Sequence, residues 1–324
     1  MPSSVNSDYN NDQNDWPAII RQVENIARAG FTHIQWIHDW EGEYLYSPSE
    51  MYYIRDLLRD LGLNCHTLHS TEGGRRVEKR PDGTGFFHNR HRLLTNIRKD
   101  YTSTVEFIRL AGTDLLKNRI ELCSLLGANA MVLHMQLPYV MFEENPEDKK
   151  AYYRQVFKSL DELEGFARNA GVKIALENLL PTPQAYMEES FDMAFNRYDD
   201  GYMGFCFDSG HATLTCRDNY YYFLEKYQSR LLVTHLQDTD GLPDELAGND
   251  LETLKHDRHW VPFSGVNNWD RIAELVAGSP VELPADFEVV FSAPTPEEEF
   301  KLLVECQERA ERFQKMVMAY RNRE

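Results

Sequence analysis

Histidine and carboxylate side chains recur in this sequence directly after short apolar runs. Such runs end as HTLHS, MVLHM, IALENL, FCFDSGHA and VTHLQD, a further run begins FEVVFS, and HDRHW lies before the last of them. The residues are His66, His69, His134, Glu177, Asp208, His211, His235, Asp238, Asp257, His259 and Glu288. A single histidine at such a place is more often a hydrogen-bonded structural residue than a ligand. The same placement after almost every run indicates a shared site.

Imidazole and carboxylate groups gathered in one place form a ligand set for a divalent metal. Carboxylates brought together repel one another unless a cation lies between them, and this mixture suits Zn²⁺, Mn²⁺, Co²⁺ or Fe²⁺ better than Ca²⁺. Asp208 has another explanation, since it could cap the helix that follows it. Glu177 is harder to explain otherwise, because a carboxylate that closes an apolar strand needs a partner for its charge. The sequence therefore predicts a divalent transition-metal site.

Motifs of several other kinds of site are absent from the sequence. There is no GxGxxG after a strand-like run, no GxxxxGK[ST] phosphate loop, no GxSxG nucleophile elbow and no HExxH. Nothing therefore indicates a dinucleotide site, a P-loop, a serine hydrolase or a zincin.

The elements that carry these residues alternate between helix and strand. Apolar residues at helical spacing, followed by a Gly or Asn stop, predict helices over 16–29, 52–61, 113–126 and 152–169. Uniformly apolar runs predict buried strands over 31–37, 63–68, 130–133, 172–176, 202–207, 231–236 and 287–291, and an eighth could be hidden in 3–7. Alternation of this kind indicates βαβ units, either closed into a barrel or left as an open doubly wound sheet.

We expect one domain over residues 1–324. Residues 1–15 form a polar N-terminal segment, and one apolar stripe predicts a final helix within 296–324. Two regions interrupt the alternation: residues 70–100, with eight basic side chains, and the Gly/Pro/Asp-rich stretch 237–268. Loops of this length are often functional lids, although the basic one could equally be a solvated surface loop.

Charge and composition narrow the possible partners. The 34 Lys and Arg against 52 Asp and Glu give a net charge of −18, which repels nucleic-acid phosphates and anionic lipid unless basic residues form a local patch. No apolar run approaches the roughly 20 residues that span a bilayer. The N-terminus lacks the basic and apolar regions of a signal peptide, and five scattered cysteines without a CxxC pair indicate reduced thiols. We therefore expect a cytoplasmic protein without a membrane or general nucleic-acid partner.

From about residue 16 onward the sequence resembles the xylose isomerase-like TIM-barrel superfamily. The motifs that carry the resemblance are GFTHIQW, LHS, LGANAMVLHM, IALENL, FDSGHA, THLQD, DRHWVPFSGVNNWD and FEVVFS. The resemblance implies an α/β fold, a single (β/α)8 barrel in which the C-terminal strand ends meet on the active-site face. The superfamily spans sugar or sugar phosphate isomerases and epimerases and the zinc-dependent abasic-site endonucleases.

For the sugar branch, the resemblance implies one metal ion, Mn²⁺, Zn²⁺ or Co²⁺, held by four residues. These are Glu177, Asp208, His235 and Glu288. Glu177 and Glu288 are also the implied catalytic residues, which move a substrate proton through an enediolate, while His211 and His259 would bind sugar hydroxyls. Enzymes of this group often form homo-oligomers. Many sugar epimerases have an arginine near the place of His259, so the histidine here could instead extend the metal site.

For the endonuclease branch, the resemblance implies three zinc ions with nine ligands. The candidates are His69, His134, Glu177, Asp208, His211, His235, Asp257, His259 and Glu288. Such a site would activate hydroxide and cleave a phosphodiester. The net charge favours the sugar branch, as do polar and aromatic insertions that suggest a closed pocket; the basic loop could hold either a DNA backbone or a sugar phosphate. The remaining possibilities are other metal-dependent sugar or polyol chemistry, such as dehydration, and a sugar-binding barrel without catalysis.

Overall fold

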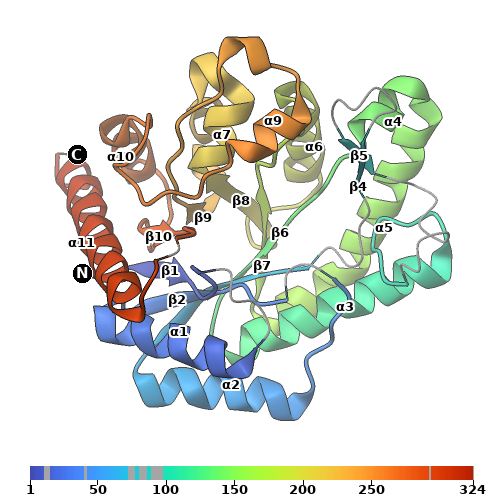
Figure 1. Ribbon diagram of the computed structural model, residues 1–324. Coiled ribbons are helices and arrows are strands. Elements are labelled where there is room, and N and C mark those ends of the chain that lie inside the picture. Colours follow the sequence, from blue (N-terminus) through green and yellow to red (C-terminus); the bar gives the residue numbers. More distant parts are fainter. Residues whose placement is uncertain are drawn as a thin grey trace.

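The computed structural model describes residues 1–10, 15–39, 42–71, 77–79, 86–88, 98–291 and 293–323. Its main sheet has eight parallel strands in the order β10-β1-β2-β3-β6-β7-β8-β9 (Figure 1). The strands are β1 Ser4–Asn6, β2 His33–Trp36, β3 Asn64–His69, β6 Ala130–Leu133, β7 Lys173–Glu177, β8 Met203–Asp208, β9 Leu231–His235 and β10 Asp286–Phe287.

Backbone hydrogen bonds between the ends of this sheet close it into a barrel. Leu236, directly after β9, forms a parallel bridge with Phe287 of β10. The nitrogen of Leu236 donates to the oxygen of Asp286 at 3.0 Å, and the nitrogen of Glu288 donates to the oxygen of Leu236 at 3.2 Å. The expected (β/α)8 barrel is therefore confirmed, and the open-sheet alternative is wrong.

Helices form a layer outside the barrel (Figure 1). The helices of the described chain, including the short α4 and α9 of the loops, are α1 Trp16–Ala29, α2 Pro48–Leu61, α3 Glu106–Leu125, α4 Tyr139–Glu144, α5 Pro146–Ala170, α6 Gln184–Arg197, α7 Ser209–Cys216, α8 Tyr222–Lys226, α9 Asp250–Lys255, α10 Trp269–Ala277 and α11 Pro296–Arg321. The final helix, α11, packs against both α1 and α10 and so joins the two ends of the chain. None of the helices in the described ranges has the length and apolar character needed to cross a membrane.

Local capping explains where several helices begin and end. Gly30 and Gly171 adopt left-handed backbone conformations directly after α1 and α5, as the predicted stops require. Helix α2 begins at residue 48 rather than at 52, because Ser47 and Glu50 form a reciprocal capping box. Helix α3 begins at residue 106, seven residues before the predicted start.

The strands agree closely with the apolar runs, and β1 is the eighth strand expected in 3–7. The N-terminal segment 1–15 therefore contributes to the barrel. The main difference is β10, which ends at Phe287 instead of extending to Phe291. Beyond it the chain bonds to loops, since the nitrogen of Val290 donates to the oxygen of His259 and that of Phe291 donates to Tyr9.

The two long interruptions contain secondary structure of their own. Residues 70–100 include an antiparallel pair, β4 Val77–Lys79 and β5 Phe86–His88. The basic residues Arg75, Arg76, Arg80, Arg90 and Arg92 lie outside the described residues, and so does the side chain of Lys79. At the end of the region, the backbone nitrogens of Arg98 and Lys99 donate to Glu43 Oε1 at 2.5 and 3.0 Å. Residues 237–268 contain α9.

Small apolar side chains fill the barrel interior below the site. Ala130, Val132, Ala175, Cys206 and Val233 form a buried cluster of their own, separate from the larger core. They occupy alternate positions along four strands, so they share the face of the sheet that also carries Glu177, Asp208 and His235. The larger core lies between the sheet and the helices. The interior is packed rather than open, and it supports the side chains above it.

We predict opposite effects for alanine at two helical glycines. A Cβ atom at Gly112 of α3 would lie 2.2 Å from the backbone nitrogen of Tyr101, whereas one at Gly165 of α5 meets nothing within 4 Å. Gly112→Ala should lower the free energy of unfolding by about 3 kcal/mol, because the backbone must move apart. Gly165→Ala should raise it by about 0.5–1 kcal/mol through helix propensity. Urea unfolding of both variants checks this; a Gly112→Ala protein as stable as wild type contradicts the close packing of α3 against Tyr101.

Candidate active site

A cavity of about 250 Å³ opens at the C-terminal ends of the barrel strands. It is lined by Asn6, Asp8, Ile37, His69, His134, Glu177, His211, Asp257, His259, Glu288 and Val290. Because parallel strands all end on this face, residues from distant parts of the chain meet here. All nine site residues expected from the sequence lie in this cavity or directly against its walls.

Four of these residues form a compact group of potential metal ligands. They are Glu177, Asp208, His235 and Glu288, and one ligand atom from each lies within 4.8 Å of the other three. The first three are the last residues of β7, β8 and β9, and Glu288 directly follows β10. Parallel pairing places Asp208 opposite His235 and Glu177 opposite Cys206. The ends of adjacent strands therefore set the spacing of the group.

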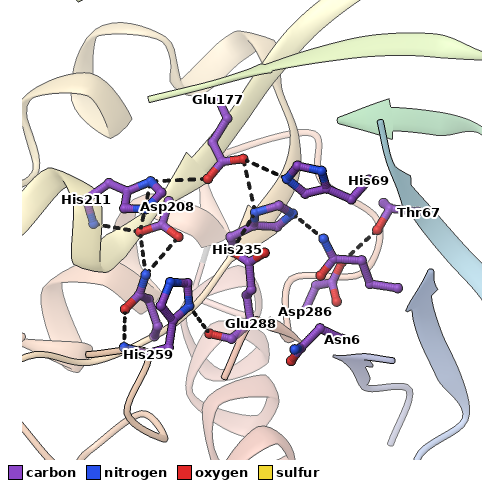
Figure 2. A network of polar contacts seen from close by, with 12 residues as sticks. Asn6, Thr67, His69, Glu177, Asp208, His211, His235, His259, Asp286 and Glu288 are labelled. Atoms are coloured by element: carbon purple, nitrogen blue, oxygen red, sulfur yellow. Dashed lines mark hydrogen bonds and ion pairs between the residues drawn. The ribbon is translucent and has the colours of Figure 1, made fainter. Parts of the chain in front are cut away.

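Unsatisfied polar atoms within this group show that it suits a cation. Glu177 Oε1 and His235 Nδ1 are buried and form no hydrogen bond of ordinary geometry with the described residues, although each lies close to an oppositely polar side-chain atom. His235 Nδ1 lies 3.0 Å from Glu288 Oε2 and 3.3 Å from Glu177 Oε2 (Figure 2). Burying such atoms without a partner costs free energy. A divalent ion contacting both carboxylates and the imidazole would satisfy them, and the imidazole-carboxylate set suits a transition metal.

His69 and His134 form a second group with Glu177. His134 Nε2 lies 3.1 Å from Glu177 Oε2 and 3.1 Å from His69 Nε2. Nδ1 of His69 is 2.9 Å from the backbone oxygen of Ser70. Because a backbone oxygen can only accept, Nδ1 donates to it, and Nε2 is the nitrogen that faces the group.

His211, Asp257 and His259 form a third group on the other side of the cavity. Asp257 Oδ2 lies 3.4 Å from His211 Nε2 and 3.3 Å from His259 Nε2. Nδ1 of His211 lies 2.9 Å from the backbone oxygen of Asn178. The opposite nitrogen therefore faces Asp257, as it would in a metal-ligating histidine. His211 Nδ1 is also 3.2 Å from Glu177 Oε1.

Gln237 joins the third group to the first. Its Nε2 donates to both carboxylate oxygens of Asp208 at 3.3 and 3.2 Å and to Asp257 Oδ1 at 3.1 Å. Its Oε1 accepts from the backbone nitrogen of His259 at 2.9 Å. A Cβ atom at Gly210 would lie 2.4 Å from the Gln237 side chain, so this close packing requires glycine. One amide thus positions three site residues.

Burial and neighbouring charges shift the pKa values of the site in opposite directions. Burial raises the pKa of Asp208 to about 7. Burial also acts to raise that of Glu288, but the imidazole of His235 outweighs it and lowers the pKa to about 2. Burial alone would lower the pKa of His259, whereas the Asp257 carboxylate raises it to about 10. The buried carboxylates therefore favour positive charge on their neighbours, which imidazolium groups or a bound cation can supply.

The sequence matches a known family over most of its length. The family model described as the xylose isomerase-like TIM barrel matches residues 23–306. The chain belongs to this family.

The chain is also similar to other proteins over most of its length. The uncharacterized protein y4fM of Sinorhizobium fredii (strain NBRC 101917 / NGR234) is 29% identical over 270 residues, which cover 83% of this chain and 80% of that protein. Among solved structures, a D-tagatose 3-epimerase-like protein is 18% identical with a TM-score of 0.67, covering 98% of this chain and 99% of the other. The 3-keto-D-glucoside 4-epimerase YcjR of E. coli is 15% identical with a TM-score of 0.61, covering 96% and 99%. At these identities the structural similarity shows the fold.

Two candidate residues of this xylose isomerase-like barrel lie away from the cavity. His66 lines a separate cavity of about 300 Å³, together with Lys173 at the start of β7 and thus at the opposite end of the barrel. Asp238 is structural, because it accepts from the backbone nitrogens of Ser264 and Asn267 and from Trp269 Nε1.

The helix-capping explanation considered for Asp208 is also correct. Asp208 Oδ1 accepts from the backbone nitrogen of His211 at 2.6 Å at the start of α7. The same residue therefore caps this helix and belongs to the group of potential metal ligands.

Polar residues on or just after β1 and β2 also belong to the site, although no sequence pattern indicated them. Asn6 and Asp8 line the cavity. Gln35 Nε2 lies 2.7 Å from His235 Nε2, whereas the other imidazole nitrogen, Nδ1, faces Glu288. Burial raises the pKa of Asp8, although the hydrogen bond from Asn6 opposes this shift. The eighth strand expected in 3–7 could have indicated Asn6 and Asp8, because the C-terminal end of every barrel strand lies on this face.

We predict that the purified protein contains stoichiometric Zn, Mn, Co or Fe and that Glu177→Gln removes most of it. Glu177 belongs to three of the candidate ligand groups, so its loss affects each of them. The control is Glu147→Gln, whose carboxylate is 72% exposed and pairs with Lys150. Elemental analysis of the three proteins gives the metal content. Wild-type protein that stays without metal after reconstitution contradicts the prediction.

Proposed function

We propose that this protein is a metal-dependent sugar isomerase or epimerase that moves a proton through an enediolate. The observation that carries the proposal is the placement of two buried glutamates, Glu177 and Glu288, on either side of one imidazole. His235 Nδ1 contacts a carboxylate oxygen of each, at 3.3 and 3.0 Å. Both carboxylates also line the cavity in which a substrate would lie. Two such bases facing one cavity suit removal of a proton from one carbon and its return to the same or a neighbouring carbon.

The divalent ion, Mn²⁺, Zn²⁺ or Co²⁺, would be held by Glu177, Asp208, His235 and Glu288. The unsatisfied buried atoms of Glu177 and His235 support this assignment. When bound, the ion supplies Lewis-acid polarisation of a substrate carbonyl and its neighbouring hydroxyl.

The protein's own side chains account for the remaining steps. One of the two glutamates accepts the proton from the substrate carbon, and the other, protonated, returns it. His211 and His259 line the cavity beside them and bind substrate hydroxyls. Gln237 holds the backbone of His259 and the carboxylate of Asp208 in place. Positioning by fixed neighbours of this kind lowers the reorganisation needed during the reaction.

The structural neighbours support a sugar substrate. Their names describe a D-tagatose 3-epimerase-like protein and a 3-keto-D-glucoside 4-epimerase. Both names concern inversion at a sugar carbon. A barrel of the same family with two glutamates at the mouth is consistent with that class of reaction.

A second candidate function, a phosphodiesterase that acts at abasic sites, is favoured by one specific observation. The groups His69–His134–Glu177 and His211–Asp257–His259 stand beside the four-residue group, so ligands for three ions are present. Two observations oppose it. The chain has a net charge of −18, which disfavours DNA binding, and none of the described residues that line the cavity is Lys or Arg.

We predict that Glu177→Gln and Glu288→Gln each lower the rate of carbon-bound deuterium incorporation into ketoses in D₂O by about 10²–10⁴-fold. Each change keeps the size of the side chain but removes the base. NMR of the sugar measures incorporation, and circular dichroism checks the fold. The control is Glu164→Gln, a partly exposed glutamate of α5 that lies outside the cavity and pairs with Arg168. Full activity in both site variants would exclude them from proton transfer.

We predict no incision of a duplex that contains an abasic site. A gel assay with wild-type protein, at low salt and with added Zn²⁺, tests this under the conditions most favourable to DNA binding. Incision that is lost in His69→Ala and His134→Ala would instead establish the phosphodiesterase.

A further inference from the structure

Asp8 is a carboxylate of the cavity wall that belongs to none of the candidate metal groups. It lies two residues beyond the end of β1, and its side chain lines the same cavity as Glu177 and Glu288. Only 7% of Asp8 is exposed. Because burying a carboxylate costs free energy, a group in this position needs donors. The protein supplies a donor for one of its oxygens, Oδ1.

Asn6 determines where this carboxylate lies. Asn6 Nδ2 donates to Asp8 Oδ1 at 2.8 Å and to the backbone oxygen of Val289 at 3.0 Å. The backbone nitrogen of Val289 donates in turn to Asn6 Oδ1 at 2.8 Å. Since Val289 directly follows Glu288, one amide fixes Asp8 relative to a proposed catalytic glutamate (Figure 2 shows Asn6 and Glu288). Asp8 Oδ2 receives no hydrogen bond from the described part of the chain.

The charged groups of the wall do not suit an anionic substrate. Among the described lining residues, the ionisable side chains are four carboxylates and four histidines. Phosphate groups in proteins are usually held by Arg or Lys, and neither lines this cavity in the described ranges. A sugar hydroxyl, by contrast, is a donor that a carboxylate oxygen accepts well.

We propose that Asp8 binds a substrate hydroxyl and selects a neutral sugar over a phosphorylated one. The inference rests on the proposed function and names the substrate class of the same site. Oδ2 accepts the hydroxyl hydrogen while Oδ1 remains bonded to Asn6. A phosphate placed beside Asp8 would meet the like charge of that carboxylate and of Glu288.

Calorimetric titration of metal-loaded protein with D-tagatose, D-fructose and their 6-phosphates tests the proposal. Wild-type protein should bind a neutral ketose about tenfold or more tightly than its phosphate. Asp8→Asn should weaken binding of the neutral sugar about tenfold or more, because an amide is a poorer acceptor, and should narrow the preference. The control is Asp60→Asn, which makes the same charge change at a side chain that is 69% exposed. It should behave as wild type.

Three outcomes separate this proposal from the proposed function. Asp8-dependent binding of neutral sugar without deuterium incorporation upholds the role of Asp8 and overturns the isomerase reaction. If deuterium is incorporated and the Asp8→Asn variant keeps the sugar affinity and KM of wild type, the role of Asp8 is overturned but the proposed function is not. Wild-type protein that binds none of these sugars overturns both. If the Asp8→Asn protein does not fold, Asp8→Ser is used in its place. Tighter binding of the sugar phosphates than of the neutral sugars by wild-type protein contradicts the proposed selectivity, and this outcome requires no variant.

Discussion

The burial of several carboxylates at one end of a barrel is the constraint on which the rest of this structure depends. Glu177 and Asp208 are almost completely buried, and Glu288 is 6% exposed. Charges removed from water need compensation close by. The imidazoles of His235, His211 and His259 face these carboxylates, and the pKa shifts of the site follow from that arrangement. A region that served packing alone would not need so many ionisable side chains in one place.

Closure of the barrel and assembly of the site depend on the same contacts. The bridge that closes the sheet joins Leu236 to Phe287, the immediate neighbours of His235 and Glu288. An open sheet would separate these two candidate ligands by its full width. Asn6 adds a second connection, between β1 and Val289, on the other side of Glu288. The position of Glu288 therefore depends on both strands adjacent to it, even though β10 has only two residues.

Sequence patterns predicted the parts of the structure that are local or repeated. The apolar runs gave the strands to within a few residues, and a ligand-type residue after nearly every run indicated the face on which they meet. What the patterns could not give were contacts between distant residues. Gln237 and Gln35 are ordinary amides in the sequence, and their roles come only from their contacts with Asp208 and His235. Asp8 was missed because β1 is short and mostly polar.

The arrangement also explains why fold alone does not decide the reaction. Glu177 Oε2 lies near His134 and His235, while Oε1 lies near His211, so one carboxylate links all three candidate groups. With one cation in the central group, the flanking histidines remain available as hydrogen-bonding groups for hydroxyls. With three cations, the same histidines become ligands, and the cavity gains the positive charge that a phosphodiester requires. Under the proposed function, the number of ions that these groups hold would therefore distinguish the two reaction classes.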